Sequence, residues 1–121
     1  MTDLTDAIPL TPAVFHILLA LAKREQHGYE IMKEVRRDSG DRIRMGNGTL
    51  YGSIKRMLAD GLIEDAGERP EGGDERRKYY RITSRGQAAL TTEIRRYVAT
   101  VEAIRNRDLM PSASTPAGAW A

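Results

Sequence analysis

The side chains best suited to chemistry in this 121-residue chain are basic and clustered, not nucleophilic or metal-ligating. Cysteine is absent, so the two imidazoles, His16 and His27, have no thiolate partners, and we expect both to cap helices or pack in the core. Acidic residues are plentiful but scattered, and the Gly-Asn-Gly run at 46–48 lacks the Lys-Ser/Thr pair of a phosphate loop. We therefore expect no metal, no cofactor and no enzymatic activity.

Basic residues are concentrated in three segments of the chain. Lys and Arg number 19 against 17 Asp and Glu, and this net charge of +2 is too small to indicate nucleic-acid binding by itself. Residues 1–22 contain no Lys or Arg, whereas basic residues cluster at 33–44, 55–56 and 76–85. Such clustering predicts a basic surface patch of the kind that contacts phosphates.

Length and hydropathy indicate one domain in the cytoplasm. A chain of this size buries enough surface to fold without disulfides or a structural metal. Its longest apolar stretch, residues 14–22, is far shorter than the roughly 20 residues that span a bilayer, so we expect no membrane contact. Asp3 and Asp6 stand where a signal peptide would carry positive charge, which favours a cytoplasmic location.

Three helices are expected before residue 61. Thr11 and Pro12 provide an N-cap and a proline at the first helical position, and the apolar residues that follow cover most of that helix's circumference. A second helix should begin at Gly28 and stop at 39–40. A third should follow the run at 47–49 and end near Gly61.

The pattern then changes to two short strands, at 62–66 and 78–83, joined by a loop that contains Pro70 and two glycines. Alternation places Tyr80 and Ile82 on the inner face of this hairpin and Tyr79 on the outer face. Thr83 is then placed to cap a long helix.

That last helix carries an apolar stripe at spacings of 4, 3, 4 and 3, namely Leu90, Ile94, Tyr97, Val101 and Ile104. The stripe exceeds what the small body can cover, so we expect it to pair with a second copy in a homodimer. The expected organisation is a flexible arm at 1–10, a body at 11–83, a dimerisation helix at 84–109 and a disordered tail at 110–121.

This order predicts a mainly α fold with a small β-hairpin, a winged helix-turn-helix domain followed by a C-terminal dimerisation helix. The third helix would enter a DNA major groove, with an apolar inner side and a small, polar or basic outer side. Base contacts are expected from Thr49, Tyr51 and Ser53, and phosphate contacts from Lys55, Arg56, Arg77 and Lys78.

The sequence resembles the PadR family of bacterial transcriptional regulators between about residues 10 and 107. The resemblance is carried by the stretches His27-Gly28-Tyr29-Glu30-Ile31, Gly48-Thr49-Leu50-Tyr51, Lys55-Arg56-Met57, Gly61-Leu62-Ile63 and Arg77-Lys78-Tyr79-Tyr80-Arg81-Ile82-Thr83 with Gly86. It implies a homodimeric repressor of the subfamily with one dimerisation helix, which binds double-stranded DNA at an inverted repeat and is often released by a small molecule.

The sequence departs from the family pattern in two places. Many members have proline where Asn47 stands, and Glu71, Asp74 and Glu75 place acidic charge in the wing. The implied effector is a small apolar or aromatic compound near Phe15 and Tyr97.

One other class of function stays open. The basic helix face could dock an acidic protein, which would make the domain a winged-helix interaction module without specific DNA binding.

Two aromatic residues are not assigned to a binding site. Tyr29 is expected to pack against the rest of the protein, and Trp120, in the tail, is not expected to stack on a ligand.

Overall fold

The computed structural model describes residues 9–70 and 76–112. Most of the expected N-terminal arm, the end of the tail with Trp120, and the hairpin tip lie outside the described residues. The acidic residues expected to weaken wing binding, Glu71, Asp74 and Glu75, belong to that tip.

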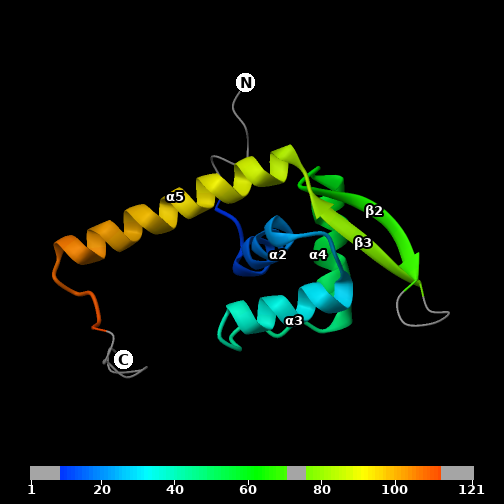
Figure 1. Ribbon diagram of the computed structural model, residues 1–121. Helices are drawn as coiled ribbons and strands as arrows, with labels where there is room; N and C mark the ends of the chain where they lie inside the picture. The colour runs from blue at the N-terminus through cyan, green and yellow to red at the C-terminus, as the bar shows by residue number, and fades with distance from the viewer. Residues whose placement is uncertain (1–8, 71–75, 113–121) are drawn as a thin grey trace.

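The elements follow the order expected from the sequence, with one short strand added. They are α2 (Pro12–Lys23), β1 (Gln26–His27), α3 (Gly28–Asp38), α4 (Asn47–Ala59), β2 (Ile63–Pro70), β3 (Arg76–Ile82) and α5 (Ser84–Asn106). In Figure 1, α2, α3 and α4 form a compact body, β2 and β3 project from one side of it, and α5 runs across the top. This arrangement confirms the mainly α winged-helix fold.

The helix α2 is buried at the centre of the body. The Thr11 hydroxyl accepts a hydrogen bond from the Val14 backbone N–H at 3.2 Å, with Pro12 in the first turn, as expected. Ile17 and Leu18 have no exposed surface, and α2 contacts α3, α4, α5 and β3. Complete burial of each such side chain contributes about 1.5–3 kcal/mol, so this helix organises the core.

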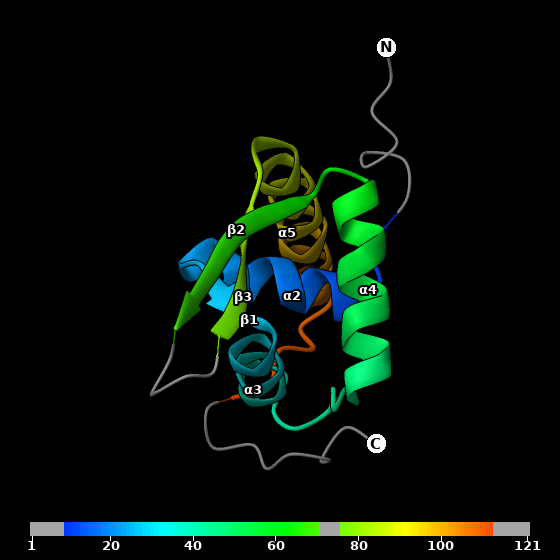
Figure 2. The same cartoon turned by 90° about the vertical axis from the view of Figure 1, so that its right-hand side faces the viewer.

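The sheet has three antiparallel strands, where the sequence indicated two. The central strand β3 pairs with β2 through Ile63 and Ile82, and with β1 through Gln26 and Tyr80. The strand β1 was not expected, because two residues are too few to display an alternating pattern. Figure 2 shows the hairpin of β2 and β3 on one side of α2 and α4 on the other.

The strands β2 and β3 are longer than the sequence indicated, because the hairpin continues past a shift in register between Asp65 and Glu68. The Gly67 backbone N–H donates to Asp65 Oδ1 at 2.7 Å at this irregularity. Tyr80 is buried and Ile82 packs against the core, which confirms their inward direction.

His27 caps α3, which confirms one of the two roles expected for it. Its Nδ1 accepts from the Glu30 backbone N–H at 3.3 Å, and the Glu30 carboxylate accepts from the His27 backbone N–H at 3.3 Å. This reciprocal pair is a capping box, which satisfies two backbone donors at the start of the helix.

Glu34 is a buried carboxylate that links α3 to α2. It accepts from Lys23 Nζ at 2.8 Å and from Arg37 Nη2 at 3.0 Å. The hydrogen bond from Lys23 is the main cause that lowers the pKa of Glu34, and burial opposes it. The carboxylate therefore stays ionised inside the fold because cations surround it.

The start of α5 is held against the backbone of the preceding loop. Thr83 Oγ1 accepts from the Gly86 backbone N–H at 3.0 Å, as expected of an N-cap, and donates to the Gly61 carbonyl at 2.5 Å. Gly86 lies so close to this loop that a Cβ added to it would stand 2.0 Å from the Leu62 carbonyl oxygen. Only glycine allows α5 to pack here.

We predict that Gly86→Ala lowers the free energy of unfolding by about 3 kcal/mol, because the new methyl group meets backbone that cannot move aside. Gly52→Ala is the matched control, since a Cβ at Gly52 faces open space and alanine favours a helix by about 0.5–1 kcal/mol. Urea unfolding at one fixed protein concentration measures both. Equal stability of the two variants would contradict the close approach of α5.

Candidate nucleic-acid interface

The helix α4 has one buried face and one exposed face. Leu50, Ile54 and Met57 are buried in the core, whereas Thr49, Tyr51, Lys55 and Arg56 are exposed. Asn47 is the first residue of the helix, a position that also suits proline, so the departure from the family pattern leaves the start of α4 intact. The outer face therefore has the residues expected of a helix that enters a DNA major groove, with one exception. We call α4 the reader helix for this expected role.

That exception is Ser53, which is 4% exposed and lies on the buried face of α4. The expectation that it touches a base edge is wrong. Residues three apart share one side of a helix, so Ser53 follows Leu50 into the interior. Its small polar side chain suggested an outer position, although its spacing from Leu50 could have placed it correctly.

The two cations of α4 differ from those of the wing. Within the described residues, Lys55 and Arg56 are exposed and no ion pair engages them. On the hairpin, Lys78 Nζ lies 3.1 Å from Asp65 Oδ2, and Arg76 Nε lies 3.5 Å from Glu68 Oε2. Of these four cations, the two on α4 are therefore the ones that no described carboxylate neutralises.

The pairing of Lys78 also changes its proton affinity. The hydrogen bond with Asp65 is the main cause that raises the pKa of Lys78. The Gly67 backbone N–H and then Lys78 lower the pKa of Asp65. Arg77, the other wing residue expected to bind phosphate, is half-buried. The ion pairs of Lys78 and Arg76 leave no local pattern in the sequence, because their acidic partners come from the opposite strand.

Two further cations of the hairpin are held by α2's C-terminal flank. Glu25 accepts from Arg69 Nη2 at 2.6 Å and from Arg81 Nη1 at 3.3 Å, and Arg81 Nε also donates to Glu64 at 2.7 Å. The Arg69 bond is the main cause that lowers the pKa of Glu25. These contacts fix the hairpin against the body.

The helix α3 contributes residues to this surface that sequence analysis did not assign to it. Tyr29, which was expected to pack, is 52% exposed, and Lys33 Nζ lies 5.1 Å from the centre of its ring. Arg36 and Arg44 both pair with the single carboxylate of Asp41. Tyr29 precedes buried Ile31 by two residues, a spacing that turns it away from the core.

Tyr51 connects α4 to the start of α3. Its side chain is 49% exposed, and its hydroxyl and ring edge lie over Gly28. Tyr79, expected to face outward, is half-buried, with the Arg69 guanidinium 4.3 Å from its ring centre and the His27 ring 5.3 Å away. Tyr51 on α4 and Tyr79 on β3 thus both lie beside the start of α3, at Gly28 and at His27 respectively.

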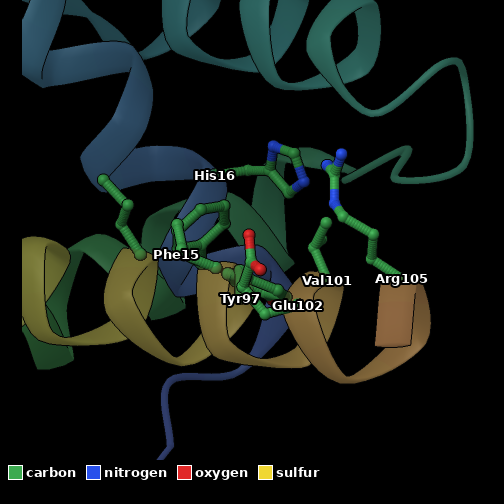
Figure 3. Close-up of a pocket in the computed structure, with 8 residues that line it drawn as sticks. Phe15, His16, Tyr97, Val101, Glu102 and Arg105 are labelled. Atoms are coloured by element: carbon green, nitrogen blue, oxygen red, sulfur yellow. The ribbon is translucent and has the colours of Figure 1, made fainter. Parts of the chain in front are cut away.

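A groove of about 580 Å³ lies between α2 and α5, away from this surface. Phe15 and Tyr97, the two residues expected to bind an effector, stand in it with ring centres 4.9 Å apart. Figure 3 shows both rings with His16 and Arg105 at the same groove. The rest of the lining consists of Ile94, Val98, Val101 and Glu102.

The apolar stripe of α5 divides between two environments. Ile94, Tyr97 and Val101 are exposed and Ile104 is partly buried, whereas Leu90 is only 4% exposed because it packs into the core of its own chain. The expectation that Leu90 faces a second copy is therefore corrected. Val98, 55% exposed, belongs to the outer face and was missed.

The part of the chain that the structure describes holds neither a metal-ligating cluster nor a membrane-spanning helix. Across residues 9–70 and 76–112, no three His, Cys, Asp or Glu side chains gather where they could hold a metal ion. No helix within those ranges is long and apolar enough to cross a membrane.

Comparison with known proteins identifies relatives of this chain. It is 38% identical over 80 residues to "Transcriptional regulator Rv3488" of Mycobacterium tuberculosis, an alignment that covers 66% of this chain and 70% of the relative. The crystal structure of a PadR family transcription regulator from Clostridium difficile is 28% identical, with a TM-score of 0.68, and the match covers 79% of this chain and 97% of that one.

A more distant similarity concerns the fold alone. Bacillus subtilis PadR, crystallised in complex with operator DNA, is 20% identical with a TM-score of 0.61, over 88% of this chain and 53% of that chain. Residues 17–92, from the core helix into the first turns of α5, match the family model described as "Transcriptional regulator PadR-like family". This match spans more than half of the sequence, and the chain therefore belongs to the PadR-like family of transcriptional regulators.

Proposed function

We propose that the protein is a homodimeric repressor that binds an inverted repeat in double-stranded DNA and is released by a small molecule. The observation that carries the DNA-binding part is the outer face of α4. There Lys55 and Arg56 are exposed, form no ion pair with any described residue, and lie beside half-exposed Tyr51. A surface of this kind suits phosphates and base edges together. Membership of a family of transcriptional regulators supports the proposal.

The contacts divide by chemistry. In this proposal Thr49 and Tyr51 touch base edges and Lys55 and Arg56 bind phosphates, which their exposure on α4 supports. Lys33 on α3 adds a cation whose described partner is the ring of Tyr29. Regulatory action follows if the bound dimer blocks access of the transcription machinery to the promoter.

The wing plays a smaller electrostatic part in this proposal. Lys78 must leave Asp65 or carry it along when it approaches a phosphate, so its net contribution to binding is reduced. Arg77 is half-buried, so only part of its side chain is available to a phosphate. The wing therefore orients the domain, while α4 supplies most of the attraction.

We predict different salt dependences for the two kinds of cation. Lys55→Ala or Arg56→Ala should weaken binding to all DNA and reduce the log-log salt slope by about two per dimer, since each subunit loses one phosphate contact. Lys78→Ala should change the slope by less than one, because Asp65 already neutralises Lys78. Fluorescence anisotropy over a range of salt concentrations, on DNA from upstream of the coding region, measures this.

The main competing function is a module that binds an acidic protein. If single alanine substitutions of Lys55, Arg56, Arg77 and Lys78 all left DNA affinity and its salt slope unchanged, the DNA-binding proposal would be wrong. The interaction-module alternative would then gain.

The proposed dimer rests on α5. The face of α5 that borders the groove beside α2 exposes Ile94, Tyr97, Val98 and Val101, with 37–55% of each residue accessible in the single chain. A continuous apolar helix face of this kind is unfavourable in water and is covered by pairing with a second α5. A two-fold axis through that pair would present two copies of α4 to successive major grooves, about 34 Å apart.

We predict that Ile94→Lys converts the dimer to a monomer, because pairing would bury an unpaired ammonium group at a cost of several kcal/mol. Ala99→Lys is the control, since Ala99 is exposed and, five residues on, points about 140° around the helix axis from Ile94. Size-exclusion chromatography with light scattering at micromolar concentration distinguishes the two. A monomeric wild-type protein would contradict the proposal.

The effector part of the proposal rests on the groove between α2 and α5. The rings of Phe15 and Tyr97, tilted by 59°, offer an apolar surface that suits a small aromatic compound. The proposed dimer face of α5 also lines this groove, so a ligand there would contact α2 and the pairing surface of α5 together. Its binding would then alter the separation of the two reader helices.

We predict that Phe15→Ala raises the concentration of an aromatic inducer needed to release DNA by about tenfold, because the ligand loses one ring face. Leu109→Ala is the control, since Leu109 is exposed and does not line the groove. Release of labelled DNA, titrated with a panel of small aromatic compounds, gives the readout. An unchanged response in both Phe15→Ala and Tyr97→Ala would place the effector elsewhere.

A further inference from the structure

We propose that Gly28 is a positioning residue for base recognition. By having no side chain, it leaves the space that the ring of Tyr51 occupies, and so it fixes the direction of that ring before DNA is bound. This inference rests on the proposed function, because it takes Tyr51 as a residue that contacts a base edge.

The geometry at Gly28 identifies Tyr51 as its neighbour. A Cβ built on Gly28 would stand 2.5 Å from Tyr51 Oη, 2.9 Å from Cζ and 3.2 Å from Cε1. These are the three nearest atoms, and two of the distances are shorter than real Cβ contacts allow. Any larger residue at position 28 must therefore displace the ring of Tyr51.

Backbone conformation does not explain the glycine. Gly28 is the first residue of α3, and its φ lies outside the positive range that favours glycine. The capping box at this point uses the imidazole of His27 and the carboxylate of Glu30, so alanine at position 28 leaves it intact. Gly28 thus differs from Gly86, where a side chain would meet the main chain.

Tyr51 rests against the body on one edge and is open to solvent on the other. Tyr51 is 49% exposed. Burial is the main cause that raises the pKa of the Tyr80 hydroxyl, and Tyr51 is close enough to Tyr80 to add to this rise. A ring already held at its inner edge loses little conformational freedom when it meets DNA. Gly28 is what permits this inner contact.

The expected effect of Gly28→Ala is therefore a change of direction at Tyr51 without unfolding. The ring stands at the end of two rotatable bonds and can turn away from the new methyl group. Alanine is well tolerated at the start of a helix. The melting temperature should stay within a few degrees of the wild-type value, while the base contact is lost.

A double-mutant cycle tests the coupling. Wild type, Gly28→Ala, Tyr51→Ala and the double variant are compared by the ratio of affinities for upstream operator DNA and random DNA. Each single substitution should reduce this ratio by about tenfold. The double variant should match Tyr51→Ala, because Gly28 acts only through the ring.

A second readout needs no DNA. The chain has five tyrosines, so selective ¹³C labelling of tyrosine rings gives a spectrum in which the Tyr51 signal is assigned from Tyr51→Phe. Gly28→Ala should shift this signal strongly. Gly52→Ala, the control beside Tyr51 in the chain, adds a methyl group that faces open space and should shift it much less.

The outcomes separate the two proposals. If Tyr51→Ala leaves the affinity ratio unchanged, the base contact of the proposed function fails and this inference fails with it. If Tyr51→Ala lowers the ratio but Gly28→Ala does not, or if the two effects add, the positioning role is overturned and the DNA contact stands. An unmoved Tyr51 signal, or an unfolded Gly28→Ala that Tyr51→Ala does not restore, would also overturn it.

Discussion

The burial of one short helix, α2, is the constraint on which the arrangement of the other elements depends. Ile17 and Leu18 point into a core to which α3, α4, β3 and α5 all contribute, so each element finds its place by covering part of α2. The same helix presents Phe15 and His16 to the groove beside α5. The orientation of the exposed face of α4 thus follows from apolar packing, and no polar residue of that face has to specify it.

Charge is distributed unevenly over the surface that this packing creates. The hairpin neutralises its own cations, as the pairs of Lys78 with Asp65 and Arg81 with Glu64 illustrate, whereas Lys55 and Arg56 on α4 are exposed. Ion pairs within a hairpin define its shape more than they attract a partner. Ion pairs therefore stabilise the shape of the hairpin, whereas exposed Lys55 and Arg56 leave positive charge on the surface of α4.

The sequence predicted local structure well and long-range pairing poorly. Thr11 and Thr83 were correctly placed as caps because a cap involves neighbouring residues only, and the apolar periods located α2 and α4. The strand β1 and the wing ion pairs escaped because their partners are distant in sequence. Leu90 and Ser53 were misassigned for a related reason: a periodic pattern gives the side of a helix, but only the tertiary fold decides what covers that side.

The connection between the wing and α5 has a mechanical consequence. Thr83 alone separates the end of β3 from the start of α5, and it is tied to the Gly61 carbonyl, so no flexible linker isolates the two elements. With 23 residues, α5 is about 34 Å long, so a rotation of 3° about its start displaces its far end by about 2 Å. Because Gly86 packs closely against Leu62, the start of α5 is held to the body, and any change in the direction of α5 is largest at its far end.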